Sequence, residues 1–160
     1  MRRLAEVPVW LGHVGDARDW SKLHDAGIEA VVALAWGEPT VILPRSMVSL
    51  RFPIIDGGGN PAWLLRSSVE AVANLIRAEV PTLICCGAGV SRTPAIAAAA
   101  LAWVREISLD DALARITQSG PTDVSPWLWA EIQAALRPTR TQSPAVEGKD
   151  EVFTSKDRLV

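Results

Sequence analysis

The chain is predicted to be an α/β protein with a central, mostly parallel sheet of four to five strands flanked by helices. Apolar runs of strand length alternate along it with helical runs whose apolar residues recur every three or four positions. Its 160 residues, 49% of them apolar, are enough for one domain with a buried core. The formal net charge of −2 gives no general attraction to nucleic acid or to an anionic membrane, so we expect neither as a partner.

The predicted strands are short, rich in apolar and β-branched residues, and bounded by glycine, proline or aspartate. In chain order they are residues 7–11, 28–35, 50–55 and 82–85. Residues 40–48 are left open, because Pro44 argues against a central strand there. Crossovers between parallel strands are right-handed, so helices are expected on both faces of the sheet.

The predicted helices begin after a capping residue and end near glycine or proline. In chain order they are residues 16–26, 61–80, 93–105, 109–119 and 126–136. Asp16, Asn60, Ser108 and Ser125 are expected to be N-terminal caps, and Gly27 is expected to end the first helix. The alanines between residues 93 and 105 lie on every face of their helix, which predicts close packing on several sides.

Residues 1–136 form the predicted domain. Residues 137–160 are polar, contain proline and show no periodicity, so we expect a disordered tail. The longest apolar run, residues 94–104, is too short to span a bilayer, and the N-terminal residues resemble no signal peptide. The adjacent residues Cys85 and Cys86 cannot join distant segments and are expected to be free thiols. These features predict a cytoplasmic protein and leave its oligomeric state open.

The stretch from Thr82 to Val104 holds the most informative pattern, which is a strand, a loop of small residues and a helix. The loop begins with the thiol of Cys86 and ends with the guanidinium of Arg92. The residues between them are Gly87, Ala88, Gly89, Val90 and Ser91. The N–H groups of such a loop and of the first helical turn have no partner within the helix, so they can point at one oxyanion. The pattern predicts an anion cradle that contains a thiol.

A cysteine beside an anion cradle indicates nucleophilic chemistry on a phosphate. The thiolate is the attacking form, and both a helix N-terminus and a nearby cation favour it. The planar guanidinium of Arg92 can bind two phosphate oxygens at once, while Ser91 and Thr93 add hydroxyl groups. The expected intermediate is a covalent thiophosphate, which divides hydrolysis into two steps.

Residues 86–93, Cys-Gly-Ala-Gly-Val-Ser-Arg-Thr, resemble the Cys-x5-Arg-Ser/Thr signature of the cysteine-dependent protein tyrosine phosphatases. They match more narrowly the Cys-x-Ala-Gly-x-Ser-Arg form of the dual-specificity branch. The resemblance extends from about Val7 to Leu136 and includes the segments 10–12, 52–56 and 108–113. It implies a phosphatase fold of the same kind for this chain.

The resemblance also implies roles for individual residues. Cys86 would be the nucleophile, and Arg92 would bind the phosphate and the transition state. Thr93 would donate a hydrogen bond to the sulfur and help it leave. Asp56, thirty residues before Cys86, would be the general acid and would then activate water. Asp123 is a competing acid, and no metal or cofactor is required because Arg92 and the loop amides stabilise the charge.

One residue departs from the family pattern. Histidine usually precedes the nucleophile in that family, and Cys85 stands in its place here. We therefore expect reduced rather than absent activity. Two alternatives follow, namely a phosphate-binding pseudophosphatase that acts as an interaction module, and a thiol redox sensor in which Cys85 traps oxidised Cys86.

The loop side chains limit the substrate. Residues 87–91 are all neutral, whereas lipid phosphatases of the family that this chain resembles have lysines in this loop. The neutral loop argues against inositides and RNA 5′ ends as substrates. The chain is also short, with no obvious extra loop to deepen a pocket. The expected substrate is phosphotyrosine on a protein, with phosphoserine, phosphothreonine and a small phosphomonoester left open.

Overall fold

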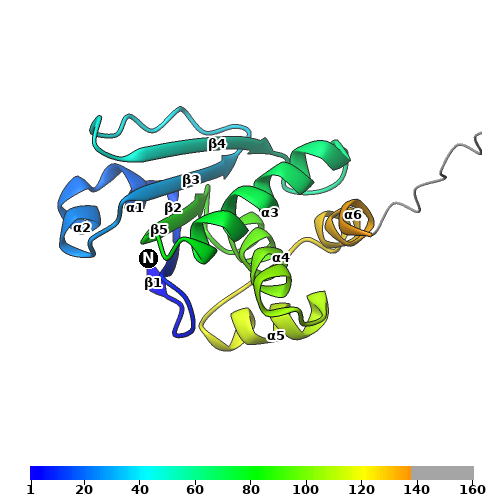
Figure 1. The fold of residues 1–160 in the computed structure, drawn as a ribbon. Helices are drawn as coiled ribbons and strands as arrows, with labels where there is room; N and C mark the ends of the chain where they lie inside the picture. The colour runs from blue at the N-terminus through cyan, green and yellow to red at the C-terminus, as the bar shows by residue number, and fades with distance from the viewer. Residues whose placement is uncertain (138–160) are drawn as a thin grey trace, which may run out of the picture.

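The computed structural model describes residues 1–137. A single sheet runs through them in the order β1-β2-β5-β3-β4 (Figure 1). The strands β2, β5, β3 and β4 are parallel, and only the two-residue strand β1 is antiparallel to its neighbour. Their bounds are β1 Arg2–Arg3, β2 Val9–His13, β3 Ala30–Ala35, β4 Val48–Ile54 and β5 Thr82–Cys86. The predicted α/β class with a mostly parallel sheet is confirmed.

Helices cover both faces of this sheet. They are α1 Val14–Arg18, α2 Trp20–Asp25, α3 Ala62–Arg77, α4 Arg92–Arg105, α5 Leu109–Gln118 and α6 Pro126–Leu136. The short helices α1 and α2 lie on one side of the sheet, and α3 to α6 gather on the other (Figure 1). No helix within residues 1–137 is both long enough and apolar enough to cross a membrane.

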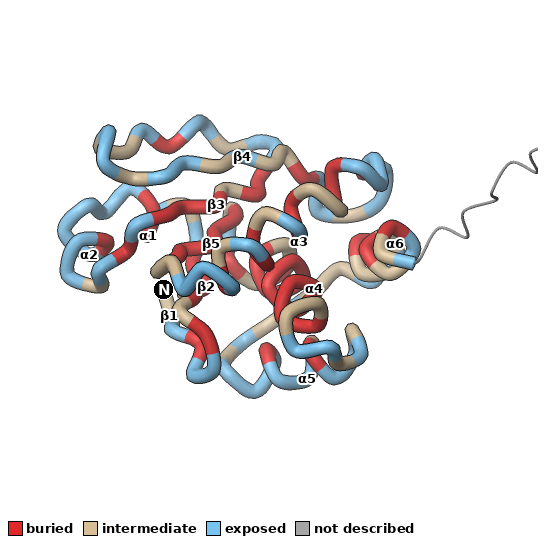
Figure 2. Tube along the Cα trace, in the orientation of Figure 1, coloured by how far each residue is buried: buried red, intermediate tan, exposed pale blue. Residues whose placement is uncertain are grey.

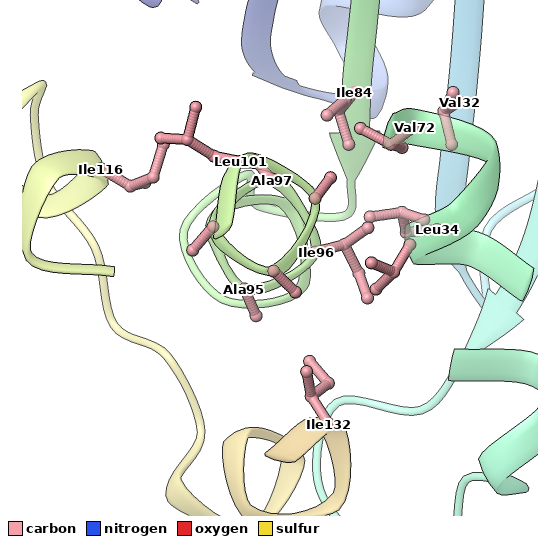
Figure 3. Close-up of a cluster of buried hydrophobic side chains, with 14 of the residues drawn as sticks. Val32, Leu34, Val72, Ile84, Ala95, Ile96, Ala97, Leu101, Ile116 and Ile132 are labelled. Carbon is pink, nitrogen blue, oxygen red and sulfur yellow. The ribbon is translucent and has the colours of Figure 1, made fainter. Parts of the chain in front are cut away.

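Helix α4 lies at the centre of the larger apolar cluster (Figure 2). Figure 3 shows Ile84 of the sheet, Ile116 of α5 and Ile132 of α6 approaching α4 from different sides. Its six alanines from residue 95 to residue 102 are each at most 3% exposed. This confirms the prediction of a helix packed on several sides, because these alanine methyl groups are buried on every face of α4.

Two predicted helix caps are wrong. Asp16 is not an N-cap, because β2 continues to His13 and the His13 side chain itself caps α1. Asp16 instead lies in the first turn of α1, where its buried carboxylate accepts from the His13 N–H at 3.1 Å and from Lys22 Nζ at 3.0 Å. Asp19 begins the separate helix α2.

Asn60 is the second wrong cap, because Pro61 stands at the N-cap of α3 and the Asn60 side chain bonds within the preceding loop. The predicted caps Ser108 and Ser125 are confirmed, since each hydroxyl accepts a first-turn N–H. Gly27, at φ 66°, ends α2 in the left-handed conformation as expected. The predicted tail beyond Arg137 lies outside the described residues, and the domain boundary at residue 136 stays a prediction.

Candidate active site

Cys86 is the last residue of β5, the central strand of the sheet. Every residue of β5 is buried, and parallel neighbours β2 and β3 pair with it on both sides. The loop that follows crosses the carboxyl edge of the sheet and leads directly into α4, where ligands bind in parallel α/β folds. The Cys86 thiol is 2% exposed and accepts a hydrogen bond from the Gly89 N–H at 3.3 Å. The predicted strand, loop and helix are therefore all present.

Gly89 fixes the shape of the loop. Its φ of 78° lies in the left-handed region, and a Cβ there would stand 2.7 Å from the Gly12 carbonyl oxygen at the end of β2. Only glycine fits such a position without strain. Because the loop packs directly on the β2 backbone, the amide of Gly89 is held against the sulfur of Cys86.

The Arg92 side chain folds back toward the loop that follows β4. Its Nη1 donates to the Ile54 carbonyl at 3.2 Å, and the side chain is 13% exposed. The buried Nε has no hydrogen-bond partner among the described residues, although Asp56 Oδ2 lies 3.8 Å away. An unpaired buried donor costs on the order of 1–3 kcal/mol, which an oxyanion bound at this position would recover.

Asp56 reaches the cradle from the loop between β4 and α3. The Ser91 hydroxyl donates to Asp56 Oδ1 at 2.5 Å, and it accepts the Ser125 N–H at 3.2 Å. Since the Ser91 hydroxyl is used in this way, it does not cap α4, and the first turn of that helix keeps its amides for a ligand. The structure thus brings Cys86, Arg92 and Asp56 to one edge of the sheet.

The remaining predicted residues lie around this centre. Thr93 is fully buried and donates to the Gly12 carbonyl at 3.3 Å, and no bond from Thr93 to the Cys86 sulfur is present among the described residues. Its predicted role as leaving-group helper stays a prediction. Gly87 is half-buried, and its lack of a side chain leaves room for two neighbours. A Cβ at this position would lie 3.3 Å from the Glu38 carboxylate and 3.4 Å from Arg92 Nη2. Ala88 is exposed and Val90 is half-buried.

Asp123, the competing candidate for the acid, contacts the cradle through its backbone and not through its carboxylate. Its N–H donates to the Val90 carbonyl at 2.7 Å, which ties the segment after α5 to the cradle. Its exposed side chain makes no hydrogen bond in the structure of residues 1–137, whereas the carboxylate of Asp56 contacts Ser91. The geometry therefore favours Asp56 over Asp123 as the acid.

Cys85 faces away from the cradle. Neighbouring residues of a strand point to opposite faces, and Cys85 enters the apolar cluster beside α1 and α2 while Cys86 enters the cluster around α4. Both cysteines are free and buried. Burial, followed by the nearby charge of Cys86, raises the pKa of the Cys85 thiol to about 12. This arrangement argues against a disulfide between the two residues, because the strand would have to be rebuilt to form it.

A residue that the sequence patterns did not indicate fastens the Asp56 loop. Glu131 of α6 accepts from the Gly59 N–H at 2.5 Å, from the Asn60 N–H at 3.2 Å and from Asn60 Nδ2 at 3.0 Å. Partial burial raises the pKa of the Glu131 carboxyl, but these hydrogen bonds outweigh it, so the pKa lies below its usual value. No local signal could have found this contact, since it joins residues more than seventy positions apart.

An apolar groove adjoins the site on the side of β4. Its hollow of about 480 Å³ is lined by Trp36, Ile55 and Trp63, which are 64%, 44% and 68% exposed. One backbone carbonyl links the two regions, because that of Ile54 accepts both the Trp36 N–H at 3.1 Å and Arg92 Nη1 at 3.2 Å. Arg51 is the charged residue of its lining.

Solved structures with this architecture include dual specificity phosphatases and a phosphatase-like protein. Human DUSP28 has a TM-score of 0.74 and 25% identity, over 84% of this chain and 94% of its own. A mouse protein assigned to the dual specificity phosphatases, solved with zinc tungstate, has a TM-score of 0.73 and 26% identity over 84% of each chain. The human tyrosine phosphatase-like serine/threonine/tyrosine-interacting protein, at 20% identity and a TM-score of 0.71 over 84% of this chain and 93% of its own, shows the shared fold alone. No protein-family model and no curated protein matches the sequence.

Proposed function

We propose that this chain, which has the fold of the cysteine-dependent protein tyrosine phosphatases and resembles their dual-specificity branch, hydrolyses phosphomonoesters through a cysteinyl-phosphate intermediate. The catalytic domain is residues 1–136. One observation carries the proposal, which is the meeting of the Cys86 thiol, the unpaired buried Nε of Arg92 and the Asp56 carboxylate around one loop. A nucleophile, an unsatisfied donor for an anion and an acid are the parts that the reaction needs.

In the first step the Cys86 thiolate attacks phosphorus, so that a sulfur–phosphorus bond forms and the bond to the leaving oxygen breaks. Protonated Asp56 gives its proton to that oxygen. In the second step Asp56 takes a proton from water, the water oxygen bonds to phosphorus, and the sulfur–phosphorus bond breaks to release phosphate. Arg92 and the loop amides hold the equatorial oxygens throughout and stabilise the charge that develops on them.

The proposed substrate is a protein that carries phosphotyrosine, with phosphoserine and phosphothreonine accepted less readily. The neutral loop residues 87–91 offer only one cation, Arg92, which suits a single phosphate better than a polyanionic headgroup. The groove supports an aromatic or peptide leaving group, because Trp36 and Trp63 present exposed apolar surface in a hollow that Gly59 and Asn60 of the Asp56 loop also line. Free thiols at Cys85 and Cys86 support a cytoplasmic location.

A pseudophosphatase is the second candidate, and two observations favour it. Cys85 replaces the histidine of the family pattern, and the Asp56 carboxylate is engaged by Ser91 and lies near Arg92. One structural neighbour carries the name of a phosphatase-like interacting protein. In this alternative the cradle binds a phosphorylated partner without turnover.

Hydrolysis of para-nitrophenyl phosphate by the wild type and by Cys86→Ser separates the two candidates. An enzyme loses at least about 10³-fold in kcat on this substitution, because serine is a far weaker nucleophile at neutral pH. Cys85→Ala is the matched control, since it removes the neighbouring thiol on the other face of β5. A wild type that is no faster than Cys86→Ser would exclude the enzyme and leave the binding module.

A further inference from the structure

The loop that carries Asp56 joins β4 to α3 and has little packing of its own. It contains Gly57, Gly58 and Gly59, and two of these, Gly57 at φ 147° and Gly59 at φ 97°, adopt backbone conformations that favour glycine. A Cβ at either of these two positions would meet nothing within 4 Å. Fixing one residue costs about 1–2 kcal/mol of conformational entropy, so the order of this loop must come from its hydrogen bonds.

Asn60 closes the loop on itself. Its side-chain oxygen accepts the Ile55 N–H at 2.8 Å, and its Nδ2 donates to the carbonyls of Ile55 and Gly57 at 3.1 and 3.2 Å. These bonds join the two ends of the segment on either side of Asp56. They do not, however, attach the loop to the rest of the protein.

Glu131 makes that attachment. We propose that Glu131 is a positioning residue for catalysis, whose carboxylate fastens the Gly59–Asn60 end of the loop to α6 and thereby holds Asp56 over the Cys86 cradle. The inference rests on the proposed function, because it assigns Asp56 the role of acid. Three N–H donors converge on the two carboxylate oxygens, and an acceptor-only group is the side chain that can satisfy all of them.

Helix α6 is a firm platform for this contact. Leu128 and Ile132 are fully buried, and Figure 3 shows Ile132 directed from α6 toward α4. The cap residue of the same helix, Ser125, gives its N–H to Ser91, which in turn donates to Asp56. One helix thus contacts both the cradle and the acid loop and links their positions.

The leaving group supplies a test that a general loss of folding would not reproduce. Para-nitrophenolate leaves easily without a proton, whereas phenolate needs the acid, so a misplaced Asp56 slows phenyl phosphate more than para-nitrophenyl phosphate. For Glu131→Ala we expect kcat/KM, which reports the first step alone, to fall about tenfold further on phenyl phosphate than on para-nitrophenyl phosphate. Glu131→Gln should lie between, because it keeps one acceptor oxygen but turns an amide donor toward Asn60.

Gln133→Ala is the matched control, since Gln133 lies on the same helix and bonds to Asp110 of α5 instead of the loop. It should leave both rates unchanged. In an Asp56→Asn background, Glu131→Ala should cause no further loss on phenyl phosphate, because the acid that it positions is already absent. Equal losses of kcat/KM on both substrates, or a full additional loss in the double variant, would overturn the proposal.

Amide hydrogen exchange at residues 57–60 tests the contact without turnover. Glu131→Ala should exchange at least about tenfold faster there than the wild type, while the amides of β5 stay protected. Unchanged exchange would overturn the positioning role. If the wild type proves no faster than Cys86→Ser but the exchange result holds, the proposed function fails and the loop attachment stands by itself.

Discussion

The cradle and the acid loop face each other across the site but are held in different ways. The cradle grows out of β5 and α4, whose residues fill the largest apolar cluster, and Gly89 presses it against the backbone of β2. The acid loop touches the rest of the protein through a few hydrogen bonds, and Asp56 itself is 43% exposed. Core packing therefore positions the proposed nucleophile Cys86, whereas a local polar network positions the proposed proton donor Asp56. Substitutions in the two regions should fail differently.

The largest expected effect concerns Arg92→Lys in the cradle. Lysine keeps the charge but loses the planar fork that binds two oxygens, so kcat/KM for para-nitrophenyl phosphate should fall about 10³-fold. The control is Arg51→Lys in the groove, which should change this small substrate's rate by less than about threefold. A modest loss with Arg92→Lys would mean that the guanidinium geometry is not used, which would contradict its assigned role.

The next effect distinguishes the two candidate acids. Asp56→Asn should lower kcat/KM for phenyl phosphate about 10²-fold, because no proton is then delivered to the leaving oxygen. Asp123→Asn should leave the rate near that of the wild type, because Asp123 supports Val90 through its backbone. A large loss with Asp123→Asn and none with Asp56→Asn would assign the acid role to Asp123. The groove beside Asp56 would then not serve the leaving group.

Sequence patterns predicted the cradle well because its parts are adjacent. The segment from Cys86 to Thr93 contains the proposed nucleophile, the small residues and the cation within one strand–loop–helix unit, so its chemistry could be predicted from that order. Asp56 was found through the family resemblance, since no local pattern connects it to Cys86. Glu131 was missed altogether, because its partners Gly59 and Asn60 are brought to it only by the packing of α6.

The two wrong helix caps, Asp16 and Asn60, were mispredicted because tertiary contacts decided their positions, as they did for Glu131. Asp16 and Asn60 are residue types that cap helices, and both precede helical sequence. In the structure, however, the β2 ladder continues to His13 and leaves Asp16 inside α1, while Asn60 bonds back to Ile55 to close its loop. The two-residue strand β1 also escaped prediction, because Arg2 and Arg3 carry no strand pattern and pair only with the β2 edge. Tertiary pairing decided each of these positions.

A third prediction compares one glycine from each region. Gly89→Ala should destabilise the protein by about 2–3 kcal/mol, since it adds left-handed strain to a contact of 2.7 Å with the Gly12 carbonyl. Gly59→Ala adds only strain, because no atom lies within 4 Å of its Cβ position, and should cost about 1–2 kcal/mol. Urea unfolding would measure both. Equal costs would show that the cradle tolerates displacement as easily as the acid loop.

The smallest effect concerns Cys85, which shares β5 with the nucleophile but lies in the core on the other face. Burial raises its pKa from 9.0 to about 12, so the unfolded chain releases this proton at lower pH than the native protein does. Stability from the protonated thiol is therefore complete below pH 9 and is lost as the pH rises toward 12. At pH 10 the loss should be on the order of 1 kcal/mol, and it should be absent in Cys85→Ala, which instead carries a constant cavity cost at every pH. If the unfolding free energies of the wild type and Cys85→Ala changed by the same amount between pH 8 and pH 10, Cys85 would not be buried and neutral. Strand β5 would then open more readily than its packing implies.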